Sequence, residues 1–414
     1  MSARSVALNA LRRWRQENDR ADAIIARSFV ETTLSAADRA FALELFYGVL
    51  RNLTLLDFWI AQLRRPHVDA GLRDVLRLGL YQLFLLKTPD HAAVNETVGL
   101  ASTRGRELIN AVLRAAIRRR NELRSRAAAQ PLSVRQSHPQ FLIARWEGNF
   151  GAETAEALCR WNNQPPPIYG RLNGVKIGRE NFLQLYPDAR HLSRNDEFVA
   201  FETFPKAAVE NGHCYVQDPS TTIACRLLDP QPGEKLLDAC AAPGGKTGYL
   251  AELMQNRGLI VACDRAAERL ALLDENMKRM GTAIVETFPI DWIRDPVLEK
   301  IAAAAPFDRV LIDAPCTNTG VMRRRVDLRW RLTPADFKRM QKRQIEIVRA
   351  VLPLLRAGGA LVYSTCSLEP EENEEVVEAL LDEMSILRAQ QEKRSLPFRD
   401  GFDGAYAVRL LKTR

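Results

Sequence analysis

The sequence lacks any uninterrupted apolar run of the roughly 18 residues that a transmembrane helix needs. Its best candidate, Leu76–Leu86, is short, contains Arg77 and is followed by Lys87, so it predicts a buried helix. Internal repeats and low-complexity tracts are absent as well. These absences argue against a membrane protein and against a repeat architecture. The 414 residues are enough for two or three globular domains.

The cysteines form no CxxC pair, and their number is odd. Their scattered spacing argues against a disulfide framework and against a structural zinc site. We therefore expect free thiols in a reducing compartment, the cytoplasm, and no bound metal. Most of these thiols should behave as small buried hydrophobic side chains. The seven cysteines are Cys159, Cys214, Cys225, Cys240, Cys263, Cys316 and Cys366.

Positive charge is concentrated at the start of the chain. Residues 1–120 contain 19 Lys+Arg and 12 Asp+Glu, whereas the rest is nearly neutral with 40 against 39, and the whole chain carries +8. This asymmetry predicts an anionic partner, with a solvated, arginine-rich helical surface as the alternative. The arginine-rich start also resembles a transit peptide. However, Glu17, Asp19 and Asp22 follow early, which favours the first helix of the fold.

The hydrophobic pattern changes along the chain and predicts three domains. Apolar residues at three- and four-residue spacing predict an all-α bundle over residues 1–125, and the small, polar and basic stretch 121–135 predicts a linker. A small α+β module is expected at 136–210. From 211 to 414 strands alternate with helices, which predicts an α/β domain with a parallel, doubly wound sheet. The final GFDGAYAVRLLK predicts an antiparallel edge strand.

A glycine-rich turn follows the first strand of the predicted sheet in LLDACAAPGGKTGYL. A phosphate-binding loop would need glycine where Cys240 stands, and the dinucleotide pattern G-x-G-x-x-G is absent. The turn Pro243-Gly244-Gly245 still allows a ligand to approach the backbone at a helix N-terminus. Such a loop suits the carboxylate of S-adenosylmethionine as well as it suits a phosphate.

Aspartates end the first three strands of this sheet. Asp264 lies 26 residues after Asp238, where an acidic side chain usually binds ribose hydroxyls, and Asp291 could reach an adenine amino group. Each aspartate alone is equally well explained as a helix cap or turn residue. Three of them beside a Gly-Gly turn predict a cofactor site at the carboxyl ends of the strands.

Two further strands end in a cysteine. Asp313-Ala314-Pro315-Cys316 ends the fourth strand, and Ser364-Thr365-Cys366-Ser367 ends the fifth. A lone cysteine is usually a buried spacer. Adjacent parallel strands, however, bring their ends to the same edge of the sheet, so both thiols are expected to face the cofactor.

A thiol beside a methyl donor suits methylation of a pyrimidine at carbon-5. A thiolate that adds to carbon-6 makes carbon-5 nucleophilic enough to accept the methyl group, and loss of the carbon-5 proton and the thiol restores the ring. The thiol must be partly ionised. Asp313 could bond the ring edge as charge develops. This chemistry does not decide whether Cys316 or Cys366 is the nucleophile.

The elements CAAPGGKT, Asp-Ala-Pro-Cys and Ser-Thr-Cys-Ser, with VQDPS ahead of them, resemble the RNA (cytosine-5) methyltransferases of the RsmB/NSUN family. The segments DRAFALELFYGVLR, LRLGLYQLFLL, HAAVNETV and INAVLR resemble the NusB-type helical RNA-binding domain. This pairing is characteristic of the bacterial RsmB branch, and the resemblance covers nearly the whole chain. It implies a Rossmann-like class I methyltransferase domain that uses S-adenosylmethionine. The implied substrate is a cytosine of 16S rRNA.

The resemblance also assigns roles to the residues that match its motifs. Cys366 would be the nucleophile, and Cys316 would assist resolution of the adduct. Asp313 would contact the ring, and Lys246 would hydrogen-bond near the target base. The implied cofactor site comprises Cys240, Ala241, Ala242, Pro243, Gly244, Gly245, Lys246, Asp264, Asp291 and Asp313.

The segment after Cys316 departs from the usual family pattern. It reads Thr317-Asn318-Thr319-Gly320 where Ser-Gly-Thr-Gly is common, and Arg325-Val326 where His-Pro is common. Trp330 is expected to pack under the loop. Arginines in this segment are expected to bind RNA phosphates, namely Arg323, Arg324, Arg325 and Arg329.

Two other functions remain open. The chain could be a non-catalytic RNA-binding or assembly factor that keeps the methyltransferase fold, or the same chemistry could act on tRNA or 23S rRNA. The intact Cys316, Cys366 and Asp313 favour the catalytic alternative. We expect a monomer that acts on 16S rRNA or a small-subunit precursor, without membrane partners.

Overall fold

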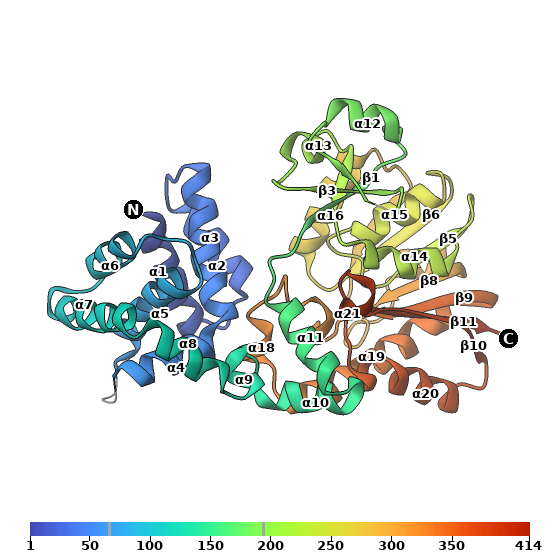
Figure 1. Cartoon of the computed structure of the whole chain (residues 1–414). Helices are drawn as coiled ribbons and strands as arrows, with labels where there is room; N and C mark the ends of the chain where they lie inside the picture. Colours follow the sequence, from blue (N-terminus) through green and yellow to red (C-terminus); the bar gives the residue numbers. More distant parts are fainter. Residues whose placement is uncertain (65–67, 193–194) are drawn as a thin grey trace. The chain divides into compact units, whose positions relative to one another are not determined.

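The computed structural model describes residues 1–64, 68–192 and 195–414 and divides into two compact units (Figure 1). Unit 1 comprises Met1–Pro165 together with Met322–Arg331, and unit 2 comprises Pro166–Val321 together with Leu332–Arg414. Across the described chain, no helix is both long and apolar enough to span a membrane.

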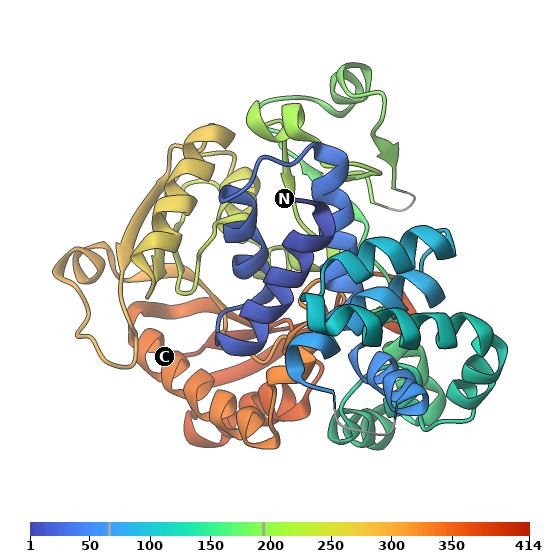
Figure 2. The same cartoon turned by 90° about the vertical axis from the view of Figure 1, so that its left-hand side faces the viewer.

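Unit 1 is all-helical, and its first eight helices pack side by side as a bundle (Figures 1 and 2). Helix α5 is buried over most of its length from Asp74 to Phe84, which confirms the buried helix expected around Leu76. Ser2, Ser35 and Asp69 accept hydrogen bonds from backbone N–H groups three residues later and thereby cap α1, α3 and α5. The helices are α1 (Ala3–Gln16), α2 (Ala21–Val30), α3 (Ala36–Arg51), α4 (Leu53–Leu63), α5 (Ala70–Phe84), α6 (Asp90–Gly99), α7 (Thr103–Arg118), α8 (Arg120–Ala128), α9 (Leu132–Arg135), α10 (Gln140–Phe150), α11 (Ala152–Asn162) and α18 (Leu328–Arg331).

The linker expected at 121–135 is wrong, because α8 and α9 occupy most of it. Leu123 and Ala127 lie one turn apart on α8, and both are buried against the bundle. The Trp59 indole donates a hydrogen bond to the backbone carbonyl of Leu123 at 3.2 Å. Helices α10 and α11, which we assigned to the small α+β module, fall within unit 1.

Unit 2 contains two sheets. The smaller has the strand order β2-β3-β1-β4, and all its described pairings are antiparallel. Its strands are β1 (Ile168–Leu172), β2 (Arg190–His191), β3 (Phe198–Phe201) and β4 (Cys214–Val216), and α12 (Arg179–Leu185) and α13 (Lys206–Glu210) accompany them.

The larger sheet has the order β10-β11-β9-β8-β5-β6-β7. Strands β5 to β9 pair in parallel, and β11 pairs antiparallel with β9. The expected parallel sheet with an antiparallel C-terminal strand is confirmed, although β10, not β11, forms the edge. The strands are β5 (Lys235–Asp238), β6 (Leu259–Asp264), β7 (Val285–Pro289), β8 (Phe307–Asp313), β9 (Leu355–Thr365), β10 (Leu387–Ser395) and β11 (Ala405–Lys412).

Helices cover both faces of this sheet, because successive strand residues point to opposite sides. Val310 and Ile312 pack with the α19 and α20 side, whereas Leu311 between them packs with the α14 and α15 side. The result is the doubly wound arrangement of a Rossmann-like domain. The helices are α14 (Thr222–Leu228), α15 (Gly245–Leu253), α16 (Ala267–Met280), α17 (Glu299–Ala304), α19 (Pro334–Val351), α20 (Glu374–Glu383) and α21 (Pro397–Asp400).

Candidate active site

Two cysteines meet at the carboxyl ends of adjacent strands. Asp313 of β8 pairs in register with Ser364 of β9, so the residues that follow leave the sheet side by side. The Sγ atoms of Cys316 and Cys366 lie 3.3 Å apart. The two thiols that we expected to share this edge are therefore in direct contact.

The two thiols differ in their surroundings. A hydrogen bond with Cys366 and burial raise the pKa of Cys316 well above its ordinary value, so this thiol stays protonated at neutral pH. Cys366 also lies 3.1 Å from the side-chain oxygen of Asn318. Asn318 adopts a left-handed backbone (φ 60°) and donates to the carbonyl of Cys316 at 2.6 Å. Thus one residue of the atypical Thr-Asn-Thr-Gly segment contacts both cysteines.

A buried carboxylate, Glu372, joins the loops that hold the two cysteines. It accepts hydrogen bonds from the backbone N–H of Thr317 at 2.8 Å, from Ser367 at 2.8 Å and from Gln344 at 3.0 Å. Burial raises its pKa, and these hydrogen bonds oppose the rise. Glu372 could not be singled out from the sequence, because residues 369–375 contain five glutamates and no spacing rule distinguishes them.

Lys246 and Asp313 form an ion pair beside the cysteines. The Lys246 Nζ lies 2.6 Å from one carboxylate oxygen of Asp313, and Ser364 donates to the other at 3.0 Å. Burial alone would lower the pKa of Lys246, but Asp313 outweighs it and the pKa is raised, so the ammonium stays charged. Lys246, Asp313, Ser364 and Cys366 line one pocket. Three of the four expected catalytic residues, Lys246, Asp313 and Cys366, therefore face the same space.

The glycine-rich turn closes onto the ends of β5 and β6. Gly244 has φ +100° at the N-terminus of α15, a conformation that a side chain rarely adopts. The backbone N–H of Ala242 donates to Asp264 at 3.3 Å, so the acidic residue at the end of β6 lies against the turn. The expected cofactor residues Cys240 to Lys246 and Asp264 are therefore brought together, and Asp291 follows the end of β7 two residues on.

Asp238 at the end of β5 is one of the three strand-end aspartates expected to line the cofactor site, although no specific contact was predicted for it. Thr247 donates to one of its oxygens at 2.8 Å, while the other is buried without a partner among the described residues. Burial, reinforced by Asp313, raises the pKa of Asp238 to about 7. An unsatisfied buried oxygen beneath the glycine-rich turn is available as an acceptor for a hydrogen-bond donor. Its position at the end of a strand is the feature of the sequence that points to a role in the site.

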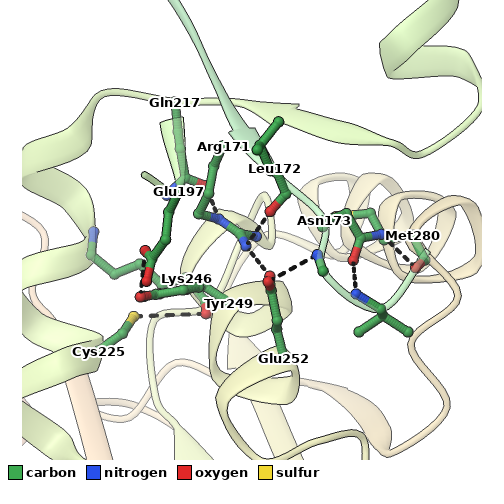
Figure 3. A network of polar contacts seen from close by, with 12 residues as sticks. Arg171, Leu172, Asn173, Glu197, Gln217, Cys225, Lys246, Tyr249, Glu252 and Met280 are labelled. Carbon is green, nitrogen blue, oxygen red and sulfur yellow. Dashed lines mark hydrogen bonds and ion pairs between the residues drawn. The ribbon is translucent and has the colours of Figure 1, made fainter. Parts of the chain in front are cut away.

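Helix α15 contributes Lys246, Tyr249 and Glu252 to a network of polar contacts (Figure 3). Arg171 of β1 is fully buried, forms an ion pair with Glu252 and lies 4.6 Å from the centre of the Tyr249 ring. Glu252 also accepts from the backbone N–H of Gly174 at 3.0 Å. The smaller sheet is thereby bonded to the helix that presents Lys246 to the site.

Two of the four arginines expected to bind RNA are buried inside unit 1, so that expectation is wrong for them. Arg329 is 0% exposed and donates to Asn163 at 2.7 Å and to the carbonyl of Asn162 at 3.1 Å. Arg323 is 2% exposed, with its guanidinium 3.9 Å from the centre of the Trp161 ring. Both satisfy protein groups instead of facing solvent.

Arg324 and Arg325 are half-buried and keep their proposed role. Trp330 packs as expected, and its indole donates to the carbonyl of Leu50 at 2.8 Å. Within the described ranges, no group of three or more His, Cys, Asp or Glu side chains is arranged to hold a metal ion.

Three family models match successive parts of the chain. A NusB family model matches residues 1–118, and a model of the ferredoxin-like domain of RsmF/B-like methyltransferases matches 138–199. The model of the 16S rRNA methyltransferase RsmB/F matches residues 225–410, which include both cysteine loops and the glycine-rich turn.

Individual proteins show the same likeness. The probable ribosomal RNA small subunit methyltransferase B of Bacillus subtilis is 34% identical over 399 residues, 92% of this chain and 88% of that protein. The ribosomal RNA small subunit methyltransferase B of Serratia proteamaculans is 35% identical over 412 residues, 92% of each chain.

Solved structures share the fold. The crystal structure of PH0851 matches 100% of this chain and 99% of its own with a TM-score of 0.79 at 24% identity. A methyltransferase homologue from Pyrococcus horikoshii matches 68% of this chain and 97% of its own with a TM-score of 0.59 at 28% identity. With a NusB-like helical region ahead of a Rossmann-like methyltransferase domain, the chain belongs to the RsmB/F family of rRNA methyltransferases.

Proposed function

We propose that this chain methylates carbon-5 of a cytosine in 16S rRNA, with S-adenosylmethionine as methyl donor and Cys366 as covalent nucleophile. The observation that carries the proposal is the pair of sulfurs 3.3 Å apart, next to the ion pair of Lys246 and Asp313. Methyl transfer to an oxygen or to an exocyclic nitrogen would not need a thiol nucleophile. Carbon-5 of a pyrimidine needs one, because the ring must first be activated at carbon-6.

Cys366 is the better nucleophile of the two thiols. It lies in the pocket with Lys246 and Asp313, whereas burial and a hydrogen bond with Cys366 keep Cys316 protonated. Lys246, which is positively charged, lines the same pocket as Cys366. The Cys366 sulfur would bond to carbon-6, and carbon-5 would displace the methyl group from the sulfonium, leaving S-adenosylhomocysteine. A base would then take the carbon-5 proton, and re-formation of the C5–C6 double bond would expel the sulfur.

Asp313 and Lys246 would orient the base. A carboxylate accepts hydrogen bonds from the cytosine amino group, and the adjacent ammonium stabilises negative charge that develops on the ring. Because Ser364 and Lys246 hold both oxygens of Asp313, the carboxylate is positioned before the base arrives.

The residues at the strand ends fit S-adenosylmethionine, which supplies an electrophilic methyl group when it is bound. The turn from Cys240 to Lys246 would bind its methionine end, Asp264 the ribose hydroxyls and Asp291 the adenine. The unpartnered oxygen of Asp238 offers an acceptor at the base of this turn.

The relatives named small subunit methyltransferase B support 16S rRNA as the substrate over tRNA and 23S rRNA. The direct test is to incubate the purified protein with labelled S-adenosylmethionine and unmodified 16S rRNA. Digestion to nucleosides and mass spectrometry should then show 5-methylcytidine at one position. Equal or greater labelling of tRNA or 23S rRNA would contradict the assigned substrate. No labelled cytidine in any RNA would favour a non-catalytic assembly factor.

Replacing Cys316 by alanine should trap the reaction after methyl transfer. The departing Cys366 sulfur would lose its neighbouring thiol donor, 3.3 Å away, and release of the RNA would slow. A slow-migrating protein–RNA complex should accumulate on denaturing gels. The double variant Cys316→Ala/Cys366→Ala is the control and should form no such complex. Free turnover of Cys316→Ala, without a trapped complex, would remove Cys316 from the release step.

A further inference from the structure

A pocket in unit 2 gathers basic side chains outside the cysteine site. It has a volume of about 290 Å³ and is lined by five cations and two carboxylates, a surplus of three positive charges. The cations come from segments far apart in the sequence. Arg265 follows β6 and Arg294 follows β7, while Arg339, Lys342 and Arg343 lie on α19. One helix with an arginine-rich solvated face would not explain cations that converge from three places.

Most of these charges are not used inside the protein. Arg265, Arg294 and Lys342 are exposed and have no hydrogen-bonded or ion-paired side-chain partner within the described part of the chain. Arg343 lies 3.9 Å from Asp291, and its Nε is buried without a hydrogen-bond acceptor among the described residues. Arg339 pairs with Asp336 at the start of α19. Cations that outnumber the carboxylates around them repel one another, so the surplus of positive charge indicates an anionic ligand.

The proposed cofactor does not supply that anion. The pocket adjoins the cofactor site through Asp291, where adenine is expected, and adenosine carries no charge. The methionine carboxylate is assigned to the glycine-rich turn after β5. An exposed pocket of arginines and a lysine at the same edge of the sheet suits phosphate groups, which guanidinium and ammonium groups bind by charge-assisted hydrogen bonds.

We propose that this pocket binds backbone phosphates of the substrate RNA, beside the cofactor and apart from the pocket for the target base. The inference rests on the proposed function, because it takes RNA as the substrate. Phosphate contacts of this kind position a strand without reading its sequence. The pocket would therefore set RNA affinity and its salt dependence and leave the chemical step unchanged.

The test is the double variant Arg294→Gln/Lys342→Gln, which removes two exposed charges without opening the core. Loss of two phosphate contacts on single-stranded RNA should lower the slope of log affinity against log salt by about 1.4 and weaken RNA binding roughly 10- to 30-fold at 0.1 M salt. We expect the KM for RNA to rise, with kcat at saturating RNA and the Kd for S-adenosylmethionine unchanged. The matched control is Lys300→Gln/Arg388→Gln, two exposed cations on α17 and β10. It should bind RNA like the wild type.

Each result decides between explanations. A wild-type salt slope in the double variant, or an equal loss in the control, overturns the phosphate pocket. A weaker Kd for S-adenosylmethionine with unchanged RNA affinity would reassign these cations to the cofactor and also overturns it. Failure of the wild type to form 5-methylcytidine overturns the proposed function instead, since RNA affinity is measured without turnover. Competition by inorganic phosphate that disappears in the double variant would show that the pocket also accepts the free anion, and supports the phosphate assignment.

Discussion

Replacing Cys366 by alanine should lower the rate of methyl transfer by roughly 10⁴-fold or more, as removal of a covalent nucleophile does in other enzymes. Without a sulfur to add to carbon-6, carbon-5 of cytosine is too weak a nucleophile for the methyl group. Cys366 lies on the loop after β9, outside the turn assigned to the cofactor. The Kd for S-adenosylmethionine should therefore stay within about twofold of the wild-type value, a shift of under about 0.5 kcal/mol.

Single-turnover methyl transfer to 16S rRNA and calorimetric titration of the cofactor measure the two quantities separately. Cys214→Ala is a matched control, because it removes a buried cysteine of the same unit from β4 and should keep most of the activity. Substantial methyl transfer by Cys366→Ala, together with its loss in Cys316→Ala, would exchange the roles of the two thiols. Equal activity in all three variants would exclude covalent catalysis by either cysteine.

Replacing Arg171 by alanine should lower the free energy of unfolding of unit 2 by roughly 3–5 kcal/mol, the usual cost of breaking a buried ion pair from one side. The substitution strips Glu252 of its cation and removes the guanidinium from the Tyr249 ring. Since Glu252 and Lys246 both belong to α15, a shift of this helix should also weaken cofactor binding (Figure 3).

Chemical denaturation followed by tryptophan fluorescence measures this effect. The transition that belongs to unit 2 is the one that S-adenosylmethionine shifts to higher denaturant, because a ligand stabilises only the part of the protein that binds it. The matched control is Arg190→Ala on β2, whose ion pair with Glu202 has both side chains about 70% exposed. This surface pair should contribute at most about 1 kcal/mol. Similar losses for Arg171→Ala and Arg190→Ala would show that burial adds nothing to the Arg171 pair.

Long-range features of the catalytic domain were predictable because they follow from local patterns. Apolar runs of strand length, separated by amphipathic helices, specify a parallel sheet, and residues that end adjacent strands must meet at one edge. For that reason Cys316 and Cys366 could be placed together from sequence, and the register between Asp313 and Ser364 brings their loops side by side.

The arginines show where local patterns fail. A run of cations with an aromatic residue suggests RNA contact on any exposed loop, but Arg323 and Arg329 are enclosed by residues of α11 and its surroundings, more than 150 positions earlier in the chain. The polar stretch at 121–135 failed as a linker for a related reason. Two apolar residues, Leu123 and Ala127, are enough to bury one face of α8 when a bundle is present to receive it.

By itself, the sequence determined the alternation of strands and helices in the methyltransferase domain, the glycine-rich turn and the two thiol-bearing strand ends, because each depends on residues that are neighbours along the chain. Only the tertiary structure decided which of five glutamates, Glu372, ties the cysteine loops together, which arginines are buried, and that Arg171 holds α15. Those outcomes depend on which polar side chains are buried away from water in the folded protein. A buried charge must find its partner in the folded protein, wherever that partner lies in the sequence.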